Sequence, residues 1–272
     1  MTDDQASRTY GDFLQLKTLL NLQDPMGGKH DAHLFVIIHQ VKELWMKLIF
    51  VELEQAIAQI REDRLAEFQK TMARVKRIQE QLIDAWSTMA TLTPWDYLTF
   101  RPYLGTSSGF QSWGYRKLEF LLGQKNRAYL KPHAHDPEVT AELEAVLARP
   151  SLYDEALICL ARRGYPVPPE RLDRDWREPY RAHPGVEAVW KTVYENAPDR
   201  FEEYALGETL VDTEYYFQLW RFKHLKTVER VIGFKPGTGG SPGVPYLKTA
   251  LDKYFYPELW TVRTALETGD ET

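Results

Sequence analysis

Several features are scarce in this 272-residue sequence, and each scarcity excludes a class of protein. Cys159 is the one cysteine, so no disulfide can form within the chain, and a reducing compartment suits it. No uninterrupted apolar run approaches the roughly 18 residues that a membrane span needs. The amino-terminal stretch MTDDQASRTYGDF is acidic and polar, unlike a secretory signal. We therefore expect a soluble, cytoplasmic protein with no membrane partner.

Charge of one sign is also lacking. The formal net charge is -5 and no basic domain stands out, so nucleic acid is not an expected partner. Aromatic residues, in contrast, reach 13%, with eight Trp and fifteen Tyr. Such a content suits either a large core or an aromatic-lined pocket, and composition leaves both open.

The hydrophobic pattern is helical nearly everywhere. Apolar residues recur every three or four positions through residues 30–60 and again through 64–91, which is helix spacing and not strand alternation. Two long helices with a short link form an antiparallel pair, the basic unit of a bundle.

The rest of the chain continues the same pattern. Thr93, Pro94 and Asp96 form a helix-start signal, and Pro102 is expected to end that short helix. A loop at 104–112 should lead into a helix from about 110. Further helices are expected at 137–148, 151–163, 206–234 and 244–265, with a proline-rich irregular region at 164–184. No strand or repeat is evident, so we expect an all-α helical bundle with long antiparallel helices, folded as a single domain over 1–272.

The run Gly237-Thr238-Gly239-Gly240 raises the question of phosphate binding. Phosphate-binding loops precede a helix, whose amino-terminal amides face the anion. This run follows the expected 206–234 helix, and the Walker and dinucleotide patterns are absent. Two interpretations stay open: a helix stop, with Gly233 a candidate, followed by a flexible loop, or a mobile loop that covers a ligand.

His224 lies in the middle of an apolar helical stripe, with Phe217, Trp220, Val228 and Val231. A buried imidazole needs a partner. That partner is either an ordinary carbonyl or side chain, or a metal such as haem iron, which a lone histidine among aromatics suits. No HExxH or CxxCH motif is present, so any haem would be held without a covalent link.

Three other polar positions and one phenylalanine are further candidates. His39 follows Phe35 by one turn, so both side chains can point to one cavity, and Tyr97 and Arg101 share a face of the short helix. Arginine can form paired hydrogen bonds with a carboxylate, or it can simply pair with Asp96 or Glu119. The HAHD stretch at 133–136 is a weak metal candidate without an evident third ligand.

Three stretches, taken together and in order, closely resemble the tryptophan 2,3-dioxygenase family. They are HDAHLFVIIHQVKELWMK (30–47), TPWDYLTFRPYLGTSSGFQSWGYRKLEF (93–120) and LVDTEYYFQLWRFKHLKTVERVIGFKPGTGGSPGVPYL (210–247). The resemblance covers nearly the whole chain, from about Tyr10 to Thr264.

The resemblance implies an all-α, haem-dependent dioxygenase. Such an enzyme holds one non-covalent haem b per subunit and inserts both atoms of O2 across the C2–C3 bond of the indole ring of L-tryptophan. The product is N-formylkynurenine, at the first step of tryptophan catabolism by the kynurenine route. The family is a homotetramer, a dimer of dimers, in which an amino-terminal segment (here about 1–25) contacts a neighbouring subunit.

The resemblance also implies roles for individual positions. His224 matches the axial ligand of the haem iron, and His39, as a catalytic residue, matches the histidine that meets the indole N–H. Substrate-binding positions are matched by Phe35, Tyr97, Arg101 and Thr238, and, from the neighbouring subunit, by Tyr10, Phe13 and Leu14. Haem-binding positions are matched by Trp86, Ser108 and Gly109.

Two departures from the family pattern affect fine details of affinity. Phe13 stands where some relatives carry tyrosine, and Ala32 replaces an acidic residue.

Two other functions also stay open at this point. One is a haem-dependent hydroxylase of an aromatic amino acid on the same scaffold, because a scaffold does not determine its reaction. The other is a helical haem-binding sensor without turnover.

Overall fold

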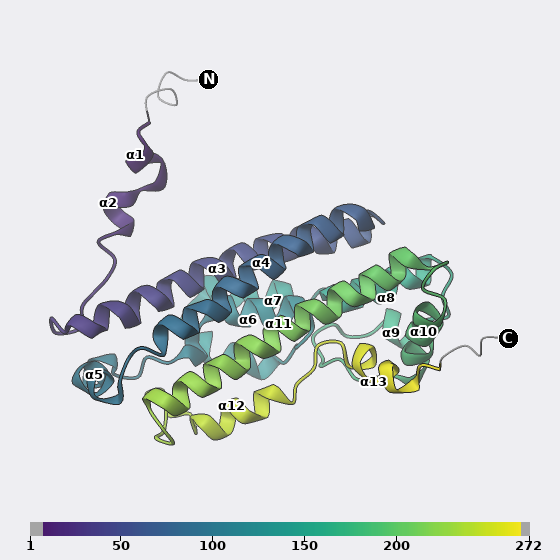
Figure 1. Ribbon diagram of the computed structural model, residues 1–272. Coiled ribbons are helices and arrows are strands. Elements are labelled where there is room, and N and C mark those ends of the chain that lie inside the picture. Colours follow the sequence, from purple (N-terminus) through teal and green to yellow (C-terminus); the bar gives the residue numbers. More distant parts are fainter. Residues whose placement is uncertain (1–7, 268–272) are drawn as a thin grey trace.

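The computed structural model of the chain describes residues 8–267 (Figure 1). Those residues contain no β-strand, which confirms the all-α fold class. The α-helices are α1 (Tyr10–Leu14), α2 (Leu16–Leu19), α3 (His30–Arg61), α4 (Leu65–Met89), α5 (Pro94–Phe100), α6 (Trp113–Leu122), α7 (Pro137–Leu147), α8 (Leu152–Arg162), α9 (Pro169–Leu172), α10 (Pro184–Glu195), α11 (Phe201–Val231), α12 (Val244–Leu251) and α13 (Pro257–Ala265). The 3-10 helices are η2 (Arg101–Leu104), η3 (Gly109–Gln111) and η4 (Arg127–His133).

Three long helices carry the fold. α3 and α4 form the expected antiparallel pair, and α11 packs along α4 (Figure 1). The turn between α3 and α4 is tight, since Asp63 adopts the left-handed conformation with φ of 58°. The faces that meet are apolar at helical spacing, with Leu53 and Ile60 of α3 and Phe68 and Val75 of α4 fully buried.

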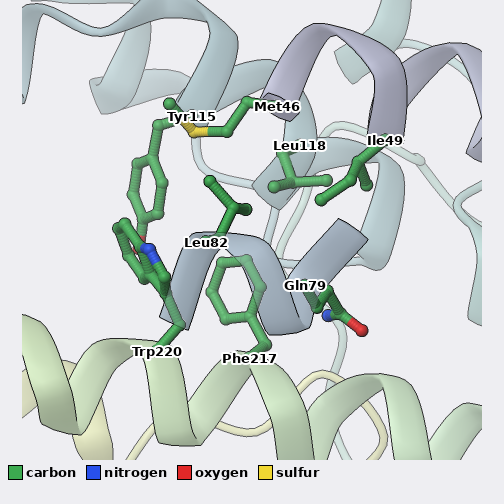
Figure 2. A pocket seen from close by; sticks show the side chains of 8 residues that line it. All are labelled: Met46, Ile49, Gln79, Leu82, Tyr115, Leu118, Phe217 and Trp220. Carbon is green, nitrogen blue, oxygen red and sulfur yellow. The ribbon is translucent and has the colours of Figure 1, made fainter. Parts of the chain in front are cut away.

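The centre of the bundle lies where α3, α4, α6 and α11 meet (Figure 2). A void of about 10 Å³ there is room for roughly one water molecule. Its walls are almost entirely carbon, and Figure 2 shows the amide of Gln79 turned away from it. The void is therefore a packing defect of the core and not a ligand site. Its lining residues are Met46, Ile49, Gln79, Leu82, Tyr115, Leu118, Phe217 and Trp220.

Several predicted boundaries need correction. The last long helix begins at Phe201 and not near 206, and α6 begins at Trp113 and not near 110. The helix expected over 244–265 is two helices, α12 and α13. They are separated because the buried carboxylate of Glu214 accepts hydrogen bonds from the backbone N–H groups of Phe255 (2.6 Å) and Tyr256 (3.1 Å), after which Pro257 starts α13.

Helix α10 was not predicted, although its pattern is present. Its buried residues Val186, Val189, Trp190 and Val193 have helical spacing. We interpreted Pro184 as the end of an irregular region, whereas it occupies the first turn of this helix. The region before it, 164–184, is irregular as expected apart from the single turn of α9.

The short helix α5 begins as predicted. Thr93 and Asp96 form a capping box, in which the hydroxyl of Thr93 accepts from the Asp96 N–H and the carboxylate of Asp96 accepts from the Thr93 N–H. The helix ends at Phe100, two residues before Pro102. This capping decides where Tyr97 and Arg101 lie.

Candidate functional site

Two histidines from two long helices face the same interior region. Burial lowers the pKa of both His39 on α3 and His224 on α11 to about 3, with the charge of Lys42 adding to the effect. The charge of His39 also lowers the pKa of His224, so the two rings are within electrostatic range of each other. Both imidazoles are therefore neutral at physiological pH, the form that can ligate a metal or accept a hydrogen bond.

The tautomer of His39 follows from its neighbour. Its Nδ1 lies 2.7 Å from the carbonyl oxygen of Phe35. A carbonyl can only accept, so Nδ1 carries the proton and donates it. The lone pair of Nε2 is left as an acceptor directed away from the helix backbone. An indole N–H is the kind of donor that this acceptor could orient.

His224 is placed differently. Its ring stacks on Trp86 with centroids 4.5 Å apart and planes at 8°, and it lies 5.6 Å from the ring of Trp220. No hydrogen bond contributes to its pKa, and neither ring nitrogen has a hydrogen-bond partner in the described part of the chain. The side chain is nevertheless half-buried and so retains some access for water. A neutral, unpartnered imidazole is suited to be a metal ligand.

The surroundings of His224 are rich in unpaired donors. The indole N–H groups of Trp86 and Trp220 are buried without a hydrogen-bond partner. The ammonium of Lys42 lies 3.4 Å from the centroid of the Trp86 ring. Haem is a flat macrocycle with an iron and two carboxylates. Such a group needs flat aromatic walls, an imidazole for the iron and hydrogen-bond donors for the carboxylates. All three are present in this region. The residues present therefore fit haem.

The alternative of a metal held by several side chains has no support. No group of three His, Cys, Asp or Glu side chains that could hold a metal ion occurs within residues 8–267. In the HAHD stretch, His135 Nδ1 lies 3.1 Å from the carbonyl of Pro132, and His133 is buried.

An aromatic wall joins the His39 region to α5. The ring of Phe35 lies 4.3 Å from that of His39, 6.0 Å from that of Tyr97 and 5.4 Å from that of Phe100, centroid to centroid. Tyr97 is buried. The structure thus brings together Phe35, His39 and Tyr97, as the sequence analysis expected. Such a wall can hold a flat apolar group beside the acceptor of His39.

Arg101 has neither of the ordinary partners that were considered for it. Its guanidinium donates to the backbone carbonyl of Pro236 at 2.8 Å. Asp96 is engaged by Thr93, and Glu119 accepts from Arg116 and Arg221. Arg101 therefore joins α5 to the glycine-rich loop. It also lines a cleft of about 240 Å³, just below the range of about 300–1,000 Å³ typical of small-molecule sites.

This cleft is separate from the histidines. Its walls come from α5 and from the end of α11, and neither His39 nor His224 lines it. Its lining residues are Pro94, Tyr97, Leu98, Arg101, Glu229, Arg230, Val231, Ile232, Gly233 and Lys235. The structure thus has an aromatic region and a charged cleft that share Tyr97.

The glycine-rich loop folds back onto the segment before η3. Helix α11 ends at Val231, and Gly233 follows with a φ of 69°, so it is the helix stop that the sequence suggested. The Thr238 hydroxyl donates to the carbonyl of Ser107. A Cβ added at Gly239 would lie 2.5 Å from the Cβ of Ser108, so this approach requires glycine. Thr238, Ser108 and Gly109 are thereby brought near one another.

That this loop is mobile and covers a bound ligand stays a prediction. The structure shows that the loop packs on residues 106–108 and that Arg101 donates a hydrogen bond to the carbonyl of Pro236.

The structure does not bring the amino-terminal residues to this site. Tyr10, Phe13 and Leu14 lie on α1, which stands away from the bundle (Figure 1). Tyr10 is 74% exposed and Phe13 is 72% exposed. Residues 1–7 of the expected 1–25 segment lie outside the described residues.

Sequence analysis overlooked Lys42. It follows His39 by three positions on α3 and is only 3% exposed. The signal was available, since a single lysine interrupts the apolar face that carries Phe35, Ile38 and Met46. We interpreted it as an ordinary charge between apolar positions.

Comparison with known proteins identifies what the chain is similar to. The family model described as "Tryptophan 2,3-dioxygenase" matches residues 2–192 and 180–266. A protein named tryptophan 2,3-dioxygenase from Burkholderia pseudomallei (strain 1106a) is 53% identical over 264 residues, which are 97% of this chain and 86% of that protein. Proteins of the same name are 52% identical in Burkholderia multivorans (strain ATCC 17616 / 249), covering 97% of this chain and 85% of that protein, and 53% identical in Burkholderia mallei (strain SAVP1), covering 97% and 86%.

Among the residues described, no helix combines the length and the apolar character needed to cross a membrane.

Proposed function

Because the chain belongs to the tryptophan 2,3-dioxygenase family, we propose that it cleaves the C2–C3 bond of the indole ring of L-tryptophan with O2 to give N-formylkynurenine. This reaction is the first step of tryptophan catabolism by the kynurenine route. The observation that carries the proposal is identity of 53% to a protein of that name over 97% of the chain. No observation favours the hydroxylase or sensor alternatives.

We infer that the cofactor is one non-covalent haem b per subunit, whose iron the imidazole of His224 would hold. When bound, haem supplies the iron at which O2 is activated. Support comes from the neutral, unpartnered imidazole of His224 and from the aromatic surface of Trp86 beside it. We assign Ser108 and Gly109 to the edge of the same cofactor, as the family resemblance implies.

His39 has the role of orienting the substrate. Its Nε2 accepts the indole N–H, while the hydrogen bond from Nδ1 to the Phe35 carbonyl holds the ring in place. Phe35 and Tyr97 contact the apolar body of the substrate and exclude water. We assign His39 an orienting role and not that of an obligatory base, because its depressed pKa makes it a poor acceptor of a full proton.

Arg101 and Thr238 bind the amino-acid end of the substrate. The guanidinium can form two parallel hydrogen bonds with the carboxylate, in exchange for its present bond to the Pro236 carbonyl. The Thr238 hydroxyl lies on the loop that Arg101 contacts, so both groups can close on the zwitterion together.

The proposed assembly is a homotetramer, a dimer of dimers. Tyr10, Phe13 and Leu14 leave the body of their own chain and are exposed, as expected of residues that enter a neighbour's pocket. Helix α3 also carries an apolar stripe at alternating spacings of four and three residues, formed by Ile37, Val41, Leu44, Leu48 and Val51. The lone, buried Cys159 suits the reducing, cytoplasmic location that we propose.

The test is turnover of the haem-loaded, ferrous protein in air. Tryptophan should be converted to N-formylkynurenine, whose formation is measured by its absorbance and by mass spectrometry. A hydroxylated product would contradict the assignment. Within the same experiment, His224→Ala should lose haem from the purified protein, whereas His39→Ala should keep haem and measurable turnover. Full activity and haem content in His224→Ala would refute the ligand assignment.

A further inference from the structure

Lys42 is a buried lysine without an anionic partner, and burial lowers the pKa of its ammonium to about 7. It is 3% exposed, and no salt bridge or hydrogen bond of its ammonium occurs within residues 8–267. Its one close polar contact is with the face of the Trp86 ring, 3.4 Å from the ring centroid. Burying an unpaired charge is costly, so such a group is expected to meet an anion in the working protein.

The acidic side chains nearby are already engaged. Glu43, the one acidic group whose charge acts on Lys42, is hydrogen-bonded to Ser112 and packs so close to Gly114 that a Cβ there would lie 2.9 Å from its Oε2. Glu119 on α6 accepts from Arg116 and Arg221. The anion that Lys42 meets therefore comes with a ligand.

Position along α3 separates this anion from the substrate's carboxylate. Phe35 lies against both His39 and Tyr97 of α5, and Arg101 follows at the end of α5. Lys42 lies three residues beyond His39, in the direction away from Phe35. Its ammonium lies over Trp86, which stacks on His224, and its charge acts on His224, so it is near the proposed cofactor position.

A second donor points to the same conclusion. The indole N–H of Trp86 is buried and has no hydrogen-bond partner. A buried donor without an acceptor costs free energy. One carboxylate could satisfy both groups, and haem b carries two.

We propose that Lys42, together with the indole N–H of Trp86, binds a propionate carboxylate of the haem and thereby retains the cofactor. This inference rests on the proposed function, since it assumes that haem is the cofactor. Lys42 acts as a cofactor-binding and positioning residue and takes no part in the reaction itself. In the haem-free protein the charged form of Lys42 is unpaired, and keeping that form lowers stability.

The test compares haem retention by the wild-type protein, Lys42→Met, Lys42→Arg and Trp86→Phe. Each haem-loaded protein is mixed with an excess of a haem-scavenging apoglobin, and haem transfer is followed at the Soret band. Lys42→Met should release haem about 10- to 100-fold faster, as expected for loss of a hydrogen bond to a charged group. Lys42→Arg should stay within about threefold of wild type because it keeps the charge. Trp86→Phe should show a smaller increase.

Two further measurements separate pairing with the carboxylate from packing. Haem dimethyl ester, whose carboxylates are blocked, should bind wild type and Lys42→Met with equal affinity. The haem-free Lys42→Met protein should melt at the same temperature as wild type or higher, because it no longer buries an unpaired charge. Lys47→Met, at an exposed position of the same helix, is the matched control and should change neither release nor melting.

The inference is overturned if Lys42→Met releases haem at the wild-type rate, or if it weakens binding of the dimethyl ester as much as that of haem. It is also overturned if the variant raises the KM for tryptophan and leaves haem release unchanged, since the partner would then be the substrate. A wild-type protein that binds no haem would instead contradict the proposed function.

Discussion

At the scale of single residues, the same side-chain type has two different environments in this site. His39 has its Nδ1 bound to a backbone carbonyl, which leaves one acceptor nitrogen with a defined direction. His224 has no such hydrogen bond, and its ring stacks on Trp86. The first arrangement suits orientation of a donor, and the second leaves a nitrogen available to a metal.

The pH dependence of turnover reports on His39. Burial lowers its pKa to about 3, so the acceptor form persists well below the ordinary histidine range. We expect kcat/KM to show no acidic limb due to this residue between about pH 5 and about pH 8. Steady-state rates across that range test this. An acidic limb near the ordinary histidine pKa that disappears in His39→Ala would contradict it.

At the scale of elements, α5 and the glycine-rich loop deliver the groups that meet the substrate. α5 is seven residues long, too short to be stable in isolation, so its capping box has a large share in its stability. The loop is held by Arg101, by Thr238 and by the close approach of Gly239 to Ser108. Changes in either element should therefore alter substrate binding more than haem binding.

Removal of the α5 cap tests the first element. Thr93→Ala should lower the free energy of unfolding by about 1 kcal/mol. It should also raise the KM for tryptophan more than it lowers kcat, because Tyr97 and Arg101 lose their fixed position. Thermal melts and steady-state kinetics measure both effects. Thr91→Ala, whose hydroxyl only donates to the Thr88 carbonyl, is the control, and equal effects of the two variants would refute the role of the cap.

The approach of the loop to Ser108 can be tested as a pair. In Gly239→Ala the added Cβ meets the Cβ of Ser108, so the loop should be displaced and the KM should rise several-fold. Ser108→Gly removes the obstructing atom. A double-mutant cycle on KM should therefore show that the double variant binds tryptophan better than the sum of the single effects implies. Strict additivity would show that the two residues do not meet in the working enzyme.

At the scale of the whole molecule, apolar surface without a partner within the chain indicates an assembly. Leu44 and Val51 of α3 are each 52% exposed, at the spacing of an interhelical seam. The exposed residues of α1 are a second such surface. Side chains of this kind are expected to be covered in the functional oligomer.

Assembly should respond to charge in the α3 stripe. Leu44→Glu combined with Val51→Glu should shift the protein from tetramer to smaller species in sedimentation velocity, because burial of unpaired carboxylates is unfavourable. Lys70→Glu, at an exposed position of α4, is the control. A tetramer unchanged by the double substitution would exclude this stripe from the interfaces.

The sequence by itself determined the long helices, the start of α5 and the histidines, because helical periodicity, capping and residue chemistry are local properties. It did not separate α12 from α13, since that break depends on the carboxylate of Glu214, more than forty positions away in the chain. Nor did it single out Lys42, because a lysine between apolar positions is ordinarily solvated. Only the packing of α3 against α4 places that ammonium over Trp86. Local pattern thus selected the elements, and long-range contacts decided which polar groups are left without a partner.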